Sequence, residues 1–234
     1  MAFQSTVNLD NPLGVPGEIL LDGPTRAAPY TLTSASAAYN IVGATAFTVS
    51  SEGVAAAGGA ATLPFAGILA QPKRYASYGT SAGGPLAATM TLPNYTVAEL
   101  LSMGQMIVTL PAAAAIGDLV TYNTTTGALA TLAPTASFTA SQSTTTLTVT
   151  AITAGNLGVG SVVTQASGSV SRIIALGTGT GGAGTYTVDT SQTVASGAAT
   201  ATSVPASGFA LVPNASVVRY TVSAAGLGVI KLTN

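Results

Sequence analysis

The 234-residue sequence contains no cysteine, no histidine and no tryptophan. Without histidine and cysteine it has no imidazole base, no thiolate nucleophile and none of the usual ligands of zinc, haem or iron–sulfur centres. No disulfide can form, so the cysteine content does not indicate a redox compartment. These absences exclude most enzyme and metalloprotein classes and predict a protein without a cofactor.

Charged residues are also scarce. They make up 6% of the sequence, six basic and seven acidic, with a net charge of -1, whereas soluble domains usually contain about 25%. Six scattered basic residues give no electrostatic footprint for nucleic acid. The mean hydropathy is +0.54, yet no run reaches the ~18 consecutive apolar residues of a membrane span. We therefore expect no nucleic-acid or membrane partner, and a neutral surface that contacts other proteins.

Strand-like patterns cover most of the chain. Short apolar or alternating runs are separated by Gly, Pro, Asn and Ser clusters, which is typical of a β-sandwich or barrel. Helical periodicity occurs only in Val97–Met103, which is too short to predict a helix. The predicted strands are 18–21, 30–33, 46–49, 88–92, 106–110, 118–122 and 128–132. The last two flank Asn123–Gly127, and we expect a hairpin whose loop ends in a glycine with left-handed backbone.

Residues 137–200 differ in composition from the rest. They are rich in Thr, Ser, Gly, Ala and Val and contain only Arg172 and Asp189 as charged residues. We interpret 137–203 as a small β module inserted into a host domain formed by 1–136 and 204–234. A flexible Ser/Thr/Gly linker is the alternative.

Alternation supports the folded module. Threonine alternates with apolar residues over Thr144–Ala151, which predicts a half-buried strand. Further strands are predicted over Gly168–Leu176 and Gly184–Val188. The residues expected inside the module are Leu147, Val149, Ile173, Ile174 and Val188.

One glycine motif resembles a nucleotide-binding signature. Gly177–Gly182 matches the pattern GxGxxG and follows a predicted strand. A dinucleotide site requires a helix directly after the glycines, because its N-terminus receives the pyrophosphate. Here a strand-like segment follows and no acidic residue lies about 20 positions on. We therefore predict a glycine-rich hairpin loop.

The ionisable residues form no recognisable catalytic or metal-binding set. Asp10, Glu18 and Asp22 are loosely spread, whereas Ca²⁺ needs about six to eight closely placed oxygens, so we expect surface charges and turn caps. No two acidic residues stand out in the sequence as the catalytic carboxylates of a glycosidase. Neither Lys73 nor Lys231 stands three residues after a serine, as a Ser-x-x-Lys acylation site requires. We predict no catalytic, cofactor-binding or metal-binding residues.

Two further short motifs have plain interpretations. Lys73-Arg74-Tyr75 holds the only adjacent basic pair, which fits a solvated loop or contact with an acidic partner surface. Asn94, Asn123 and Asn214 begin glycosylation sequons. The start of the sequence shows neither the basic nor the apolar region of a signal peptide, so we expect these sequons to be chance matches.

Several sequence blocks together carry a resemblance. The blocks are Met1–Asn8, Gly17–Ala27, Tyr95–Gly104, Val212–Tyr220 and Gly226–Asn234. In this order they resemble the structural cement, or capsid decoration, proteins of tailed bacteriophages, whose best-known member comes from a short-tailed phage of Bordetella. The similarity covers residues 1–135 and 204–234. Residues 137–200 depart from it and resemble Thr/Gly-rich β modules of other phage structural proteins.

The resemblance implies a jellyroll-like β-sandwich or barrel on the outer surface of the virion capsid, assembled in the host bacterial cytoplasm. It also implies a protein that bridges neighbouring major capsid proteins and forms homodimers or homotrimers. Such a protein acts through binding free energy, because a ligand of the mature lattice stabilises that lattice by mass action. The alternative functions are a virion module that binds a host receptor or glycan, and a hydrolase, which the missing residue types disfavour.

Two structural expectations complete this hypothesis. Ala2–Leu13 has little periodicity, and we expect an extended arm that adds a strand to a neighbouring copy. We expect residues 137–200 to form an outward-facing head that is dispensable for capsid attachment. A loop facing the capsid could not accept so long an insertion without displacing the contact surface.

Overall fold

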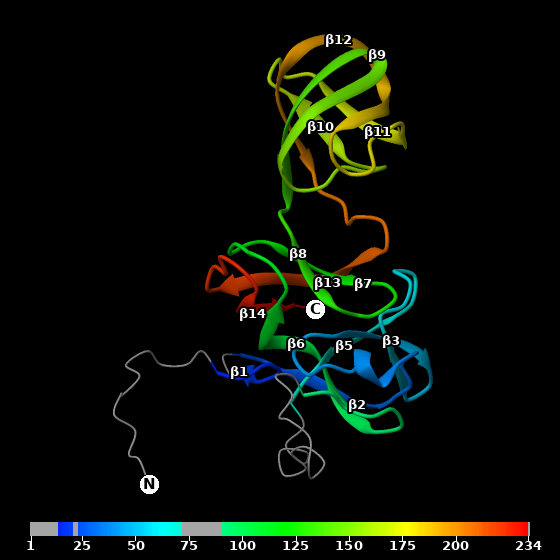
Figure 1. The fold of residues 1–234 in the computed structure, drawn as a ribbon, viewed down its shortest axis with the longest axis vertical. Helices are drawn as coiled ribbons and strands as arrows, with labels where there is room; N and C mark the ends of the chain where they lie inside the picture. The colour runs from blue at the N-terminus through cyan, green and yellow to red at the C-terminus, as the bar shows by residue number, and fades with distance from the viewer. Residues whose placement is uncertain (1–13, 21–22, 72–89, 234) are drawn as a thin grey trace, which may run out of the picture.

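The computed structural model describes residues 14–20, 23–71 and 90–233 (Figure 1). Within these ranges the protein is built of β-strands, and the 3₁₀ turn η1 (Ala37–Tyr39) is the only helical element. No helix in the described part is long and apolar enough to cross a membrane. The predicted all-β class is confirmed. The predicted arm Ala2–Leu13 and the basic motif Lys73–Tyr75 lie outside the described residues.

The strands fall into two sheets. The first contains β1 (Ile19–Leu20), β2 (Arg26–Leu32), β3 (Ala46–Ser51), β4 (Val54–Ala57), β5 (Phe65–Leu69), β6 (Val97–Leu110), β7 (Leu119–Asn123), β8 (Leu129–Leu132), β13 (Phe209–Arg219) and β14 (Gly226–Leu232). The second contains β9 (Thr135–Ala154), β10 (Val162–Gln165), β11 (Val170–Leu176) and β12 (Gly184–Thr202).

Strand β6 organises the first sheet. Its N-terminal half pairs with β2 and β5, which closes a barrel in the order β2–β4–β3–β5–β6. Its C-terminal half pairs with β14, and β13, β7 and β8 follow in that order. Its N-terminal half includes Val97–Met103, the segment with weak helical periodicity. Buried and exposed residues alternate at its start, as they do in a strand with one face on the core.

The hairpin predicted over Asp118–Leu132 is confirmed as β7 and β8. Gly127 closes its loop with φ 73°, a conformation that glycine adopts without steric cost. The Asn123 Oδ1 accepts hydrogen bonds from the backbone N–H groups of Thr125 (2.9 Å) and Thr126 (3.0 Å). The strand predicted over Ala88–Leu92 is not formed in its described part, Met90–Leu92, where Thr91 makes only an isolated bridge to Ile41.

The second sheet is built around two long, bent strands. β9 and β12 pair in antiparallel fashion along most of their lengths, with register shifts that mark the bends. β10 pairs with the end of β12, and β11 pairs with β10 and with the start of β12. The segments therefore form a ring: start of β9, end of β12, β10, β11, start of β12, end of β9.

This ring encloses a hydrophobic core of its own, which a flexible linker would lack. The core residues are Ala136, Phe138, Ala140, Leu147, Val149, Leu157, Val163, Ile173, Tyr186, Val188, Ala199 and Ala201. The strand predicted over Thr144–Ala151 is confirmed, with Leu147 and Val149 inside. The predicted burial of Ile174 is wrong, since its side chain is 51% exposed. Successive residues of a strand face opposite sides, so only Ile173 of this pair points inward.

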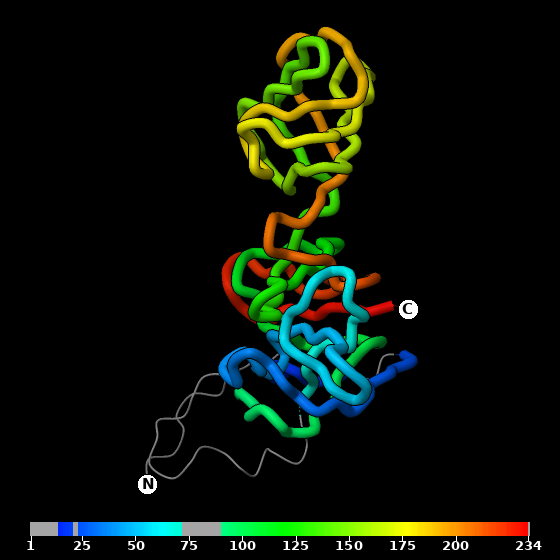
Figure 2. The backbone as a smooth tube through the Cα atoms, turned by 90° about the vertical axis from the view of Figure 1, so that its right-hand side faces the viewer, coloured from blue at the N-terminus to red at the C-terminus, as the bar shows by residue number. Residues whose placement is uncertain are grey.

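The two sheets lie end to end in two lobes (Figures 1 and 2). We call residues 135–202 the head and the other described residues the body. The chain enters the head from β8 and leaves it toward β13. The two chain segments that connect the body with the head lie side by side. Ala136 is the register partner of Ala201, and the Ser203 N–H donates to the Pro134 carbonyl at 3.0 Å.

Candidate functional site

Two of the described acidic side chains, those of Glu18 and Asp118, serve local structure. The Asp118 Oδ2 accepts a hydrogen bond from the Ala115 N–H at 2.8 Å, and the Glu18 Oε2 accepts one from the Val15 N–H at 3.2 Å. In the described part of the chain no three acidic residues come close enough to hold a metal ion. Asp10 and Asp22 lie outside it. Turn capping is therefore the role of Glu18 and Asp118.

The GxGxxG motif is the loop between β11 and β12, as predicted. Gly179 lies against the ring of Tyr186, and a Cβ at Gly179 would come 2.4 Å from the tyrosine Cζ. The Tyr186 hydroxyl donates to the Gly182 carbonyl at 2.6 Å and accepts from the Gly181 N–H at 3.1 Å. Burial raises the pKa of Tyr186, and the hydrogen bond from Gly181 opposes that rise. Gly179 is needed for packing against this tyrosine, and a strand follows the loop.

A network of hydrogen bonds inside the body fixes the backbone of the segment that leads into β6. The Asn94 Oδ1 accepts from the Ser34 N–H (3.1 Å) and the Asn40 Nδ2 (2.9 Å), and the Asn94 Nδ2 donates to the Ser34 carbonyl (2.8 Å). The Tyr95 N–H then donates to the Leu32 carbonyl at 2.8 Å. Asn94, the first of the three sequon asparagines, therefore has a structural role that the sequence alone did not reveal.

This network holds Tyr95 in an unusual conformation. The backbone of Tyr95 has φ 65°, a left-handed value that is costly for a tyrosine. Tyr95 is 83% exposed, and Val97, two residues further on, is 61% exposed. Strained, exposed residues that the surrounding structure holds in place occur often at functional sites. Tyr95 is the strongest candidate for a contact residue in the body.

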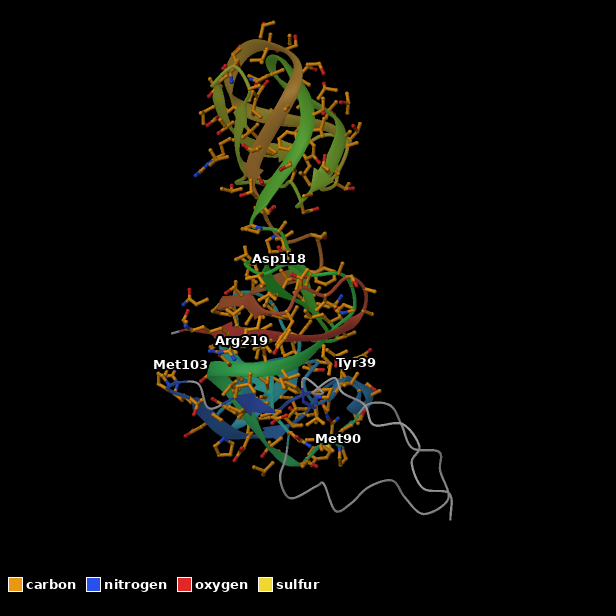
Figure 3. The ribbon with its side chains drawn as sticks, turned by 90° about the vertical axis from the view of Figure 1, so that its left-hand side faces the viewer. Tyr39, Met90, Met103, Asp118 and Arg219 are labelled. Atoms are coloured by element: carbon orange, nitrogen blue, oxygen red, sulfur yellow. The ribbon has the colours of Figure 1, made fainter. Side chains whose placement is uncertain are left out.

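We call Met90, Tyr95 and Val97 the tip surface. Met90 is 37% exposed, and it lies at the end of the body away from the head (Figure 3). The start of β6 lies at the same end (Figure 1). Three large, exposed side chains at one end form a surface suited to contact with another protein.

A second exposed pair lies on the flank of the body. Ile116 is 61% exposed, and Tyr220 is 57% exposed with φ 64°. The segments that carry them are joined by the hydrogen bond from the Gly117 N–H to the Val217 carbonyl, at 2.8 Å. The flank thus repeats the combination of an exposed tyrosine and left-handed backbone found at the tip.

A groove of about 280 Å³ lies where the middle of β6 and the end of β14 meet the Gly23–Pro24 turn. The only ionisable side chain in its lining is Lys231, near Gln105, whose buried Oε1 accepts no hydrogen bond. A single amine beside an amide does not form a nucleophile–base pair. The described lining of this groove therefore gives no support for a hydrolase.

A protein-family match supports a structural role. The family described as "Structural cement protein (E217 gp24/Pam3 gp6)" matches residues 3–164. A solved chain from a structure titled "The capsid of Myoviridae Phage XM1" is 15% identical, with a TM-score of 0.43 over 100% of this chain and 98% of that chain. No curated protein sequence gives a significant match.

The family match extends beyond the region in which the sequence blocks showed the resemblance. It continues through β9 into β10, so residues 135–164 of the head lie within it, and residues 204–234 lie outside it. It covers more than half of the sequence. The chain belongs to the phage structural cement protein family and is a non-enzymatic component of a virion capsid.

Proposed function

We propose that this protein binds the outer surface of the mature capsid through the tip surface and bridges neighbouring major capsid proteins. The observation that carries the proposal is the position of the tip surface. Met90 lies at the end of the body away from the head (Figure 3), and so does the start of β6 (Figure 1), which carries the exposed Val97 and directly follows the exposed Tyr95. Attachment through this end leaves the head free to project into solvent.

The binding energy of such a contact comes mainly from apolar burial. An aromatic side chain buries roughly 150–250 Å², and apolar burial contributes about 25 cal/mol per Å². The backbone of Tyr95 is already held by the Asn94 network, so little backbone freedom remains to be lost on binding. Many copies on one shell, each contacting more than one capsid subunit, gain further from multivalency.

We further propose that residues 1–136 and 204–234 form the capsid-binding domain, and that 137–203 are an inserted, outward-facing module. This division is supported by the pairing of Ala136 with Ala201, which places the two connections between body and head side by side. An insertion whose ends are neighbours can be added to a parent hairpin without displacing the strands around it.

Self-association completes the proposed arrangement. We propose a homodimer or homotrimer joined through the body, with Ala2–Leu13 adding a strand to a neighbouring copy. Among the described residues β1 pairs only with β6, so one side of β1 is available to another strand.

The proposal is tested by replacing residues 137–200 with a short Gly/Ser linker between Ala136 and Ala201. The shortened protein and the full chain are mixed with expanded capsids and with unexpanded shells, and bound protein is counted after sedimentation. We expect both proteins to bind expanded capsids equally well and to bind unexpanded shells poorly. A folded shortened protein that fails to bind expanded capsids places the attachment surface in the head and contradicts the proposal.

The same two proteins address the alternative function. If the head binds a host receptor or glycan, virions that carry the shortened protein lose adsorption to host cells while their heat resistance is unchanged. A cement role for the body predicts unchanged adsorption.

A further inference from the structure

The outer face of β11, together with Asp189 on the neighbouring strand β12, forms an unusual surface of the head. Val170 and Ile174 are 53% and 51% exposed, and Leu176 at the end of β11 is 48% exposed. Val170, Arg172 and Ile174 alternate with the buried Ser171 and Ile173, so the three point outward together. The face lies on the side of the head in Figures 1 and 2, between its far end and its junction with the body.

Both charged residues of the segment 137–200 belong to this face. Ile173 is the register partner of Val188, which places Arg172 opposite Asp189. The Asp189 Oδ1 accepts hydrogen bonds from the Arg172 N–H (2.8 Å) and the Thr190 hydroxyl (3.0 Å), and these bonds lower the pKa of Asp189. The carboxylate is therefore held in a fixed position, in its charged form, beside an exposed guanidinium group.

We propose that this face binds the same face of a second copy of the chain, so that neighbouring heads pair on the capsid. An isologous contact requires a surface that is complementary to itself. A face with one cation, one anion and apolar side chains around them meets this requirement. A two-fold axis near Arg172 brings each guanidinium to the partner's Asp189, and β11 of one head against β11 of the other.

Because the face is small, we expect the contact to form only between copies that are anchored on the capsid. A stable protein–protein interface buries about 800 Å² and roughly 20–30 residues on each side, far more than this face offers. Free heads therefore do not pair measurably. Copies anchored side by side reach effective concentrations of about millimolar, at which a weak contact is occupied. The inference rests on the proposed attachment of many copies to one shell.

The absence of cysteine from the chain allows a direct test. Ile174→Cys is introduced into the full chain, bound to expanded capsids and treated with a short bis-maleimide crosslinker. Thr139→Cys is the matched control, because Thr139 is exposed on the start of β9, across the ring from β11. We expect covalent dimers from Ile174→Cys on capsids, and few dimers from Thr139→Cys or from either protein free in solution.

Charge reversal tests the complementarity. Arg172→Glu alone and Asp189→Lys alone should each reduce dimer yield from Ile174→Cys several-fold, and their combination should restore it, with folding checked by thermal melting. The inference is overturned if the two cysteine positions give equal yields of covalent dimer, or if charge reversal leaves the dimer yield unchanged. Loss of capsid binding by Ile174→Cys also overturns it, because the face would then contact the shell. If the unmodified chain does not bind capsids, the proposed function itself fails.

Discussion

Replacing Tyr95 by asparagine separates stability from capsid binding. Tyr95 is 83% exposed, so the folded protein loses little buried area when the ring is removed. Its φ of 65° costs a tyrosine about 1 kcal/mol, whereas asparagine visits this region more readily. We therefore expect the free energy of unfolding of Tyr95→Asn to stay constant or to rise by up to about 1 kcal/mol.

The affinity of Tyr95→Asn for the capsid, in contrast, should fall. If the contact buries about 150 Å² of the ring, about 25 cal/mol per Å² gives an upper value of ~4 kcal/mol. If Tyr95 is one of the few hot-spot residues of the contact, its truncation costs at least about 2 kcal/mol, which corresponds to a roughly 30-fold higher Kd. The assays are thermal unfolding of the free protein and a sedimentation titration against expanded capsids.

Tyr220→Asn is the matched control for this prediction. Tyr220 has nearly the same left-handed φ of 64° and is 57% exposed, but it lies on the flank of the body. We expect Tyr220→Asn to bind capsids as the unmodified chain does. The assignment of the tip as the contact surface is refuted if Tyr95→Asn binds with unchanged affinity, or if both variants lose affinity equally.

Other predictions concern the head. The buried Gln142 donates to the carbonyls of Thr144 and Thr190 at 2.9 and 2.6 Å and accepts from Gln165 at 2.9 Å. Because Gln142→Ala removes these hydrogen bonds, it should lower the free energy of unfolding, measured by chemical denaturation, by about 3 kcal/mol. A loss below ~1 kcal/mol would falsify this role. Tyr186→Phe removes both hydrogen bonds of the hydroxyl and should cost about 1–2 kcal/mol. Burial raises the pKa of Tyr186 above its usual 10.0, so the unfolded chain releases this proton first as the pH rises. The contribution of Tyr186 to stability should therefore be constant below about pH 10 and be lost as the pH rises further, and the loss of stability at alkaline pH should be smaller in Tyr186→Phe.

The sequence predicted the strands better than the surfaces. The alternation Thr146–Leu147–Thr148–Val149 defined both a strand and its buried face, because side-chain direction in a strand has a period of two. The assignment failed at Ile174, where two adjacent isoleucines gave no indication of which one faced the core. Local sequence patterns do not record how strands curve into a ring, and the inward choice depends on that curvature.

The contact surfaces depended even more on the tertiary structure. Tyr95 stood within a block that resembled the cement family, but its exposure and backbone conformation follow from hydrogen bonds among Ser34, Asn40 and Asn94. These residues are separated by up to 60 positions. Gln142 likewise acquires its partners from three different strands. Contacts between distant segments leave no periodic signal in the sequence, whereas the absence of catalytic residue types was visible from composition alone.

The most direct test of the central claim compares virions that contain this protein with virions that lack it. The temperature at which DNA is released is measured by a fluorescent dye during slow heating, and the protein is counted per particle by quantitative gel analysis. We predict that particles assemble without the protein, release DNA at a lower temperature, and regain the original release temperature when purified protein is added back. Equal release temperatures for complete and depleted particles would contradict a cement function.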